Sequence, residues 1–212
     1  MKAPLLAAAC VLVLGGCAGR GGEIDATGGI TAVRSACPAV AIPANTGDVT
    51  LFDPAASTDA SAIDVTATMT NVRSTCNDAG EQVQTAVTFA VDATRTRTDA
   101  PRDVTLPYFI TVVQGGSAVV AKRVGQVALH FNAGQRTAQA SGRASTQVSR
   151  AAATLPEDVR RRLTRKRKAG EEDAAVDPLT TPEVRQAVQR ATFEALVGFQ
   201  LTDAQLRYNA TR

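Results

Sequence analysis

Apolar and polar residues alternate from position 63 to 70, and again through most of positions 82–95. A period of two is typical of a β-strand with one buried face. Between the two segments, Asn77-Asp78-Ala79-Gly80 offers the residue types that tight turns favour. The pattern predicts an antiparallel hairpin whose apolar side chains share one face: Ile63, Val65, Ala67, Met69, Val83, Val87, Phe89, Val91 and Ala93.

Three further strands follow along the chain. Residues 104–113 and 118–131 flank Gln114-Gly115-Gly116-Ser117, which is a hairpin signal. A turn at 132–135 leads into a strand at 136–148 that is rich in Thr, Ser and Ala, and we expect this strand near a sheet edge. Aromatic residues make up only 4% of the chain, so the core must consist largely of Val, Ile, Leu and Ala. The regular strand spacing favours a mainly β fold, an immunoglobulin-like antiparallel β-sandwich.

A helical hairpin is expected as a C-terminal insert at about 154–195. Thr154 is the predicted N-cap of its first helix, and Val159 and Leu163 are its apolar contacts. We expect this helix to run to Lys168 and to stop at Gly170.

The second helix of the insert is predicted to begin at Thr-Thr-Pro-Glu, residues 180–183, which has the form of a capping box with an early proline. A closing strand is expected at 196–201, and a second capping box at 202–205 predicts a short terminal helix. The buried stripe of the second helix would be Val184, Ala187, Val188, Ala191 and Ala195.

The first seventeen residues are typical of a secretory signal, with Lys2 before an apolar run of about ten residues that is too short to span a bilayer. The closing tetrapeptide, Leu14-Gly15-Gly16-Cys17, resembles the lipobox of bacterial lipoproteins, in which the cysteine receives a diacylglyceryl group before cleavage. The resemblance implies a signal peptide at 1–16 and a lipid on Cys17. An ordinary secretory signal that is cut nearby is the alternative.

Residues 17–29 are rich in glycine and predict a lipidated flexible tether. We expect a single domain at 30–212. Ala18, and not Asp, follows the lipobox cysteine, and by resemblance this implies sorting to the outer membrane with the domain facing the periplasm.

Two of the four cysteines remain for a disulfide. Cys10 would leave with the signal and Cys17 would be acylated, so Cys37 and Cys76 are expected to pair in an oxidising periplasm. Two reduced, buried thiols are the alternative. A metal site is not expected, because the chain holds one His and no Cys-x-x-Cys.

Catalytic motifs are not found in the sequence. His130 lies between Leu129 and Phe131 in a predicted strand, so alternation points it away from both, toward solvent. We therefore expect no enzyme and no cofactor, although a cleft with converging acids would revive a hydrolase. The rings are assigned to packing: Tyr108, Phe109, Phe193, Phe199 and Tyr208.

Seven cations cluster in the first predicted helix of the insert. One interpretation is a solvated helix surface, since bases near a helix C-terminus suit the helix dipole. The other is attraction to anionic lipid, peptidoglycan or an acidic envelope protein. Nucleic acid is not expected, because no aromatic residues are interleaved with the bases. The cluster is Arg160, Arg161, Arg162, Arg165, Lys166, Arg167 and Lys168.

Two segments, Leu106-Pro107-Tyr108-Phe109 and Val197-Gly198-Phe199-Gln200-Leu201-Thr202, resemble uncharacterised envelope lipoproteins of alphaproteobacteria, a resemblance that implies no activity. The sequence therefore predicts a membrane-anchored, periplasm-facing lipoprotein that acts as a structural or protein-interaction module of the envelope. The alternative is a small-ligand or glycan-binding module that uses one face of the sandwich.

Overall fold

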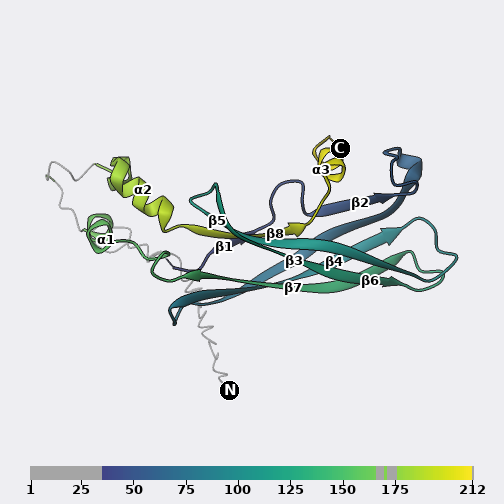
Figure 1. Cartoon of the computed structure of the whole chain (residues 1–212), viewed down its shortest axis with the longest axis horizontal. Coiled ribbons are helices and arrows are strands. Elements are labelled where there is room, and N and C mark those ends of the chain that lie inside the picture. Colours follow the sequence, from purple (N-terminus) through teal and green to yellow (C-terminus); the bar gives the residue numbers. More distant parts are fainter. Residues whose placement is uncertain (1–34, 166–169, 171–175, 212) are drawn as a thin grey trace, which may run out of the picture. The chain divides into compact units, whose positions relative to one another are not determined.

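A computed structural model of the chain describes residues 35–165, 170 and 176–211. Among these residues, eight strands form two four-stranded sheets, accompanied by three short α-helices and two 3₁₀ turns (Figure 1). The prediction of a mainly β fold is confirmed. The elements are β1 (Ala39–Ala41), β2 (Asp48–Phe52), η1 (Ala60–Ala62), β3 (Ile63–Asn77), β4 (Gln82–Arg95), β5 (Arg102–Gln114), β6 (Ala118–Phe131), β7 (Thr137–Ser149), α1 (Glu157–Thr164), η2 (Pro178–Thr180), α2 (Pro182–Arg190), β8 (Phe193–Phe199) and α3 (Asp203–Thr211).

Several predictions fall on residues outside the described part of the chain. They are the signal peptide at 1–16, the lipidated Cys17, the tether at 17–29 and the start of the domain at residue 30. Lys166, Arg167 and Lys168 of the basic cluster also lie outside it.

The strand order is β2-β3-β4-β7 in one sheet and β1-β8-β5-β6 in the other. All neighbours are antiparallel except β1 and β8, which run parallel. The predicted hairpins, β3 with β4 and β5 with β6, are confirmed. The prediction that the Thr-, Ser- and Ala-rich strand lies at a sheet edge is also confirmed, since β7 is the last strand of its sheet.

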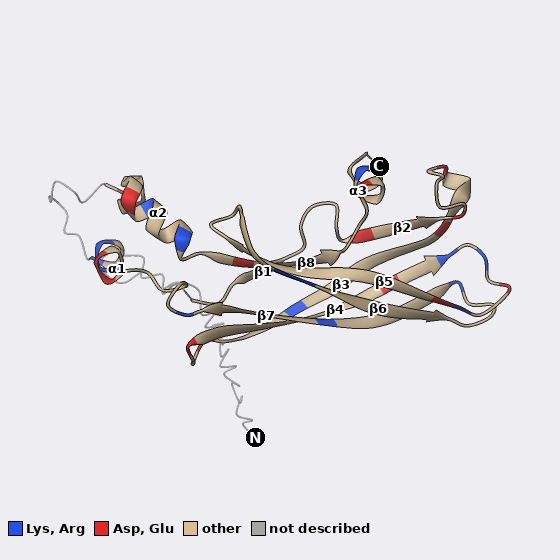
Figure 2. Ribbon diagram, viewed as in Figure 1, with Lys and Arg blue, Asp and Glu red and all other residues tan. Residues whose placement is uncertain are grey.

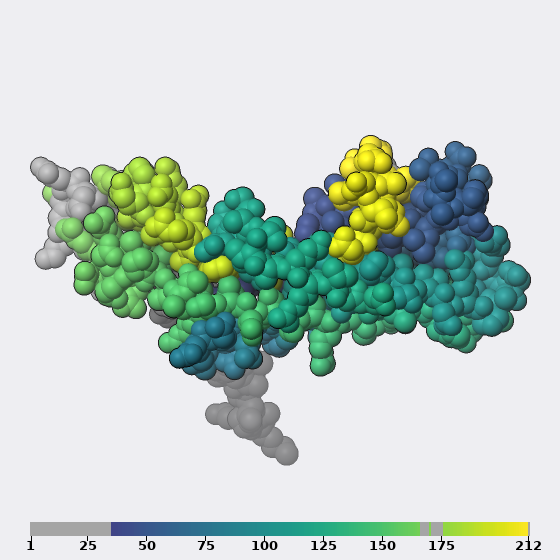
Figure 3. Space-filling model, in the orientation of Figure 1, coloured from purple at the N-terminus to yellow at the C-terminus, as the bar shows by residue number. Residues whose placement is uncertain are grey.

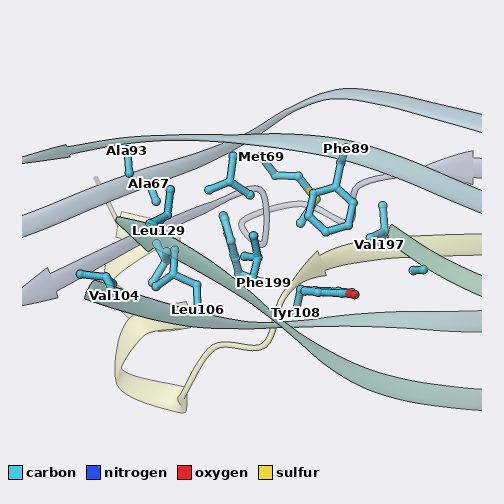
Figure 4. Packing of buried hydrophobic residues seen from close by; sticks show 14 of the residues in the cluster. Ala67, Met69, Phe89, Ala93, Val104, Leu106, Tyr108, Leu129, Val197 and Phe199 are labelled. Carbon is cyan, nitrogen blue, oxygen red and sulfur yellow. The ribbon is translucent and has the colours of Figure 1, made fainter. Parts of the chain in front are cut away.

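The main core lies between the two sheets, because the alternating strands turn their apolar faces toward each other (Figure 4). Phe89 of β4 and Tyr108 of β5 meet edge to face, with ring centroids 5.0 Å apart. Each ring lies against a glycine of the neighbouring strand, Gly142 for Phe89 and Gly125 for Tyr108, where a Cβ atom would overlap the ring. The two glycines therefore provide the space that the two rings occupy.

A second, smaller cluster closes the far end of the sandwich. It consists of Val83, Val112, Val148 and Phe193, and Cys37 packs against it. Cys37 forms a disulfide with Cys76 near the end of β3, with Cα atoms 6.0 Å apart. The predicted disulfide is confirmed, and it ties the segment before β1 to the opposite sheet.

The helical hairpin is confirmed, because α1 and α2 share a cluster of Val159, Val184 and Ala187. The predicted ends of α1 are wrong. Pro156 is the N-cap residue, and Thr154 instead donates its hydroxyl to the carbonyl of Arg150 at 2.6 Å. The helix stops at Thr164, and Arg165 is extended. Continuing the helix would place like charges four residues apart without burying further apolar surface.

The start and end of α2 also differ from the prediction. Thr181 is the N-cap but makes no side-chain capping bond, so only the early Pro182 of the predicted capping box is realised. The helix ends at Arg190, before the predicted limit of the insert at 195. Ala195 is fully buried in β8, which pairs with β5 from residue 193 onward. The β8 pairing therefore overrides helix propensity at these residues.

The tip of the β5–β6 hairpin fixes the junction between α2 and β8 (Figure 3). The Gly115 amide donates to the Thr192 carbonyl at 3.0 Å, and Gln114 donates its side-chain amide to the Arg190 carbonyl at 2.6 Å. Gly115 has a φ of +62°, a conformation that favours glycine.

The terminal helix α3 has the predicted capping box. The Gln205 side chain accepts from the Thr202 amide at 2.9 Å, and Thr202 accepts in return from the Gln205 amide at 3.3 Å. The helix docks through Asn209, which donates to the Asn45 and Asp48 carbonyls at 2.9 and 2.8 Å. It therefore covers β2, a five-residue strand that the sequence analysis did not predict.

Candidate functional site

One end of the sandwich holds a charged cluster around Asp64. This residue is only 5% exposed, and Arg102 donates to both of its carboxylate oxygens, each at 2.7 Å. Arg97 lies 3.9 Å from the same carboxylate and also pairs with Asp53. The hydrogen bond from Arg102 keeps the pKa of Asp64 below its usual value, although burial opposes this. The buried charge is therefore satisfied within the fold, and the cluster serves stability.

Arg95 is a buried guanidinium with a similar structural role. It donates to the carbonyls of Gln135, Ala100 and Asn132, at 2.9, 2.7 and 2.8 Å. Its guanidinium carbon also lies 5.1 Å from the centre of the Phe131 ring. The side chain thereby fastens the connections that follow β4 and β6.

The prediction that His130 faces solvent is confirmed. Its side chain is 58% exposed, and Nδ1 lies 2.6 Å from Oδ1 of Asp103, whose side chain is 81% exposed. The pair is a cross-strand contact between β6 and β5 that is open to water. Nowhere in the described part of the chain do three or more His, Cys, Asp or Glu side chains gather in a way that could hold a metal ion.

The outer face of the β2-β3-β4-β7 sheet is polar and connected by hydrogen bonds between strands. Asp92 accepts from Thr70 at 2.7 Å and from Gln139 at 2.6 Å, and these two bonds lower the pKa of its carboxyl. An open depression of about 580 Å³ extends from this face to His130. Its polar lining on the sheet consists of Thr66, Thr68, Asp92, Thr94, Thr137 and Gln139.

The structure describes four of the seven cations in the predicted basic cluster. Arg160 pairs with Glu157 on the same helix. Arg161 and Arg162 are exposed in the last turn of α1, and Arg165 is exposed just after it. Figure 2 shows that α1 carries both basic and acidic segments. The described part of the cluster is therefore a mixed surface, in which α1 exposes three cations and one of them, Arg160, is paired with an acid.

An open depression of about 1040 Å³ lies where β7 leads into α1. Arg150 lines it, but its guanidinium donates to the carbonyls of Asp78, Ala79 and Gly80, at 3.2, 3.2 and 3.5 Å. This arginine holds the β3–β4 turn against the end of β7. The guanidinium of Arg150 is therefore already engaged within the fold and is a poor candidate for binding a ligand in this depression.

The first half of β6 is exposed on both faces. Every residue from 118 to 124 is exposed, with Val119, Val120 and Val124 at 64%, 50% and 59%. No strand in the described part of the chain pairs with β6 on the side away from β5. The second half differs, since Leu129 and Phe131 are buried. We call residues 118–124 the free edge of β6.

A cleft of about 420 Å³ opens beside the free edge, where β6 and β7 diverge (Figure 1). Arg123 lines it from β6, on the same strand face as the buried Val127 and Leu129. This arginine has no hydrogen bond or ion pair to any other residue that the structure describes. The opposite wall comes from β3, β4 and β7 and includes Cys76, Gln84, Thr85, Ser145, Thr146 and Gln147.

The free edge and the cleft form the candidate site, and sequence reasoning did not find them. Alternation placed 118–131 in a strand but could not reveal that half of this strand lacks a cover. No helix in the described ranges is long and apolar enough to cross a membrane. Searches of protein-family models, of curated proteins and of solved structures found no match to the chain.

Proposed function

We propose that this chain is a lipid-anchored protein of the bacterial envelope whose β-sandwich acts as a protein-interaction module. The anchor is a lipid on Cys17, and the proposed location is the outer membrane, facing the periplasm. The tetrapeptide Leu14-Gly15-Gly16-Cys17 after an apolar run supports the anchor. The Cys37–Cys76 disulfide supports an oxidising compartment, because such bonds persist there.

The observation that carries the interaction role is the free edge of β6. Exposed valines at an unpaired strand edge are typical of surfaces that contact another molecule. Val119, Val120 and Val124 gather here, next to the uncommitted Arg123. The charged groups around Asp64, in contrast, are already satisfied inside the fold.

The interaction role can be tested by photo-crosslinking in the native envelope. A photoreactive residue at Val119 or Val124 is expected to capture a specific partner, since both side chains are exposed at the free edge. Thr88 on the outer face of the other sheet is the matched control, and it should capture none. Absence of any adduct from both edge positions would contradict the proposal.

The lipid anchor has a separate test. Replacing Cys17 by Ala in the full chain should abolish incorporation of a labelled fatty acid and release the protein from the membrane fraction. Mass spectrometry of the native product should find a modified cysteine at its N-terminus. An unmodified N-terminus elsewhere would remove the anchor from the proposal.

A small-ligand or glycan-binding role is the second candidate, and the polar outer face of the β2-β3-β4-β7 sheet favours it. The depression there presents hydroxyl, amide and carboxylate groups that suit sugar hydroxyls. Calorimetry with soluble peptidoglycan fragments should show binding that Asp92→Asn weakens and Asp78→Asn, on the distant β3–β4 turn, leaves intact. Equal titrations for both variants would exclude this face.

The basic cluster is proposed as a contact with anionic lipid, peptidoglycan or an acidic envelope protein, and not with nucleic acid. The exposed Arg161 and Arg162 support this role. Co-sedimentation of the Cys17→Ala chain, which lacks the proposed lipid, with anionic and with neutral vesicles tests the lipid contact. Unchanged binding after replacement by Ser at four positions would exclude it: Arg160, Arg161, Arg162 and Arg165.

We propose no catalytic role and no cofactor. The only imidazole of the chain, His130, belongs to a pair that is open to water.

An immunoglobulin-like fold requires a particular strand order in addition to two packed sheets. In an immunoglobulin sheet of order ABED, strand B pairs with E. Here β3 pairs with β2 and β4, its neighbours along the chain. We therefore propose a shared sandwich architecture and not a shared connectivity.

A further inference from the structure

We infer that the free edge of β6 accepts an extended segment of a partner protein as an additional strand, and that this segment carries adjacent carboxylate side chains. The inference rests on the interaction role proposed above and names the mode of binding and the chemistry of the partner.

The backbone of the free edge supplies the first step. Lys122, Arg123 and Val124 pair with Thr111, Ile110 and Phe109 of β5. In an antiparallel pair, alternate residues direct both backbone polar groups toward the partner strand, and the residues between them direct theirs to the other side. The groups on the other side face no described strand. An added strand would pair these donors and acceptors, which is how extended peptides bind to exposed sheet edges.

The cleft supplies room for that strand. Neighbouring strands lie about 4.8 Å apart, so an added strand would occupy the space where β7 has moved away from β6. The boundary lies near Tyr108, whose hydroxyl donates to the Arg143 carbonyl of β7 at 2.5 Å and closes the sandwich there. Beyond Gly125, alternate side chains of β6 are buried, and only residues 118–124 are exposed on both faces, so we place the site there.

The side chains at the edge select the chemistry of the partner. Arg123 points into the cleft, and Lys122 lies on the opposite face, with its amino group 5.2 Å from the centre of the Phe109 ring. Successive residues of an added strand alternate between these two faces. Two adjacent carboxylates would therefore meet one cation each, and apolar flanking residues would cover Val120 and Val124.

The same charges disfavour a second copy of this chain as the occupant. Antiparallel pairing of two free edges would bring two copies of Lys122 and of Arg123 to one seam, and like charges across strands are destabilising. A register shift between Val112 and Val113 also interrupts the ladder near Val120. Lysine and bulges at an edge are typical means of preventing self-association. A foreign segment with carboxylates compensates the charge.

The test measures fluorescence anisotropy of a labelled peptide, Thr-Val-Glu-Glu-Val-Val-Thr, with the full chain in detergent. A peptide with Lys-Lys in place of Glu-Glu is the control. We expect Arg123→Glu to weaken binding of the acidic peptide at least tenfold and to improve binding of the basic one. Arg207→Glu, at an exposed position on α3, should change neither. Amide hydrogen exchange at 118–124 should slow when the acidic peptide is bound.

Other results would overturn the inference in distinguishable ways. Equal binding of the two peptides, or no effect of Arg123→Glu, excludes the carboxylate partner. Binding without slowed exchange at 118–124 excludes strand addition. A dimer in sedimentation that Arg123→Glu dissociates assigns the edge to a second copy. If no peptide binds while crosslinks from Val119 and Val124 capture a partner, this inference fails and the interaction role stands. If those crosslinks also capture no partner, both the strand-addition inference and the proposed interaction role are wrong.

Discussion

Removing the disulfide between Cys37 and Cys76 is expected to lower the free energy of unfolding by about 4 kcal/mol. The bond joins residues with a sequence separation of 39. In the chain-entropy model, closing a loop of about 40 residues removes about 13 cal/mol/K from the unfolded chain, or about 4 kcal/mol at 25 °C. Because domains are typically stable by only about 5–15 kcal/mol, the bond would account for a large share.

The structure allows this loop effect to be measured with little interference from packing. Cys76 is exposed and Cys37 is half-buried, so replacing both by Ala removes little buried surface. Guanidinium unfolding of the full chain and of the Cys37→Ala/Cys76→Ala variant gives the difference. Ser74→Ala, an exposed change on the same strand, is the control and should lie within about 0.5 kcal/mol of the parent.

The slope of the denaturation curve provides a second readout. Without the cross-link the unfolded chain expands and exposes more surface, so the m-value should rise together with the loss of stability. A loss below about 1 kcal/mol with an unchanged slope would refute the loop-closure reasoning, because it would mean that the unfolded chain stays compact without the bond.

Three further perturbations test individual features of the fold. Thr85→Val should raise the free energy of unfolding by about 1 kcal/mol, since its buried hydroxyl has no hydrogen-bond partner among the described residues; a loss in thermal denaturation would contradict this. Asp64→Asn should cost about 2 kcal/mol at pH 7. The pKa of Asp64 is lowered in the folded state, so its contribution is full above the unfolded value near 3.8 and is lost as pH falls through the folded value. The parent should therefore lose more stability than the variant below about pH 4, and parallel pH profiles would refute the assignment. Gly142→Ala should cost about 2 kcal/mol in chemical denaturation, because its Cβ atom would overlap the Phe89 ring. Gly80→Ala, whose Cβ atom would meet its nearest neighbours only at 4.0 Å, is the control, and equal stabilities would rule out the close approach.

Local pattern was sufficient to predict the hairpins and not the sheets. Alternation together with turn residues located β3, β4, β5 and β6, because each pair is joined by a short turn. The pairings of β4 with β7, of β5 with β8 and of β1 with β8 join distant segments, and tertiary contacts alone decide them. The short β2 has too few residues to establish a period.

The same limits apply to the site. His130 could be oriented by alternation, since its neighbours in the strand are apolar. Arg95 could also have been found this way, because it occupies the same series of odd positions in β4 as Val91 and Ala93, which are buried. The free edge of β6 could not be predicted from alternation, because its exposure depends on where β7 diverges from β6. The end of α1 likewise depends on how little of that helix α2 can cover.

The parallel pairing of β1 with β8 sets the order in which the domain can be completed. In its sheet, β1 has β8 as its single neighbour, and β8 follows β1 by about 150 residues in the sequence. During synthesis, β1 therefore has no native strand to join until the ribosome has made residue 196. Until then its backbone groups must be hydrated or shielded, so this sheet is completed only after residue 196 has been made.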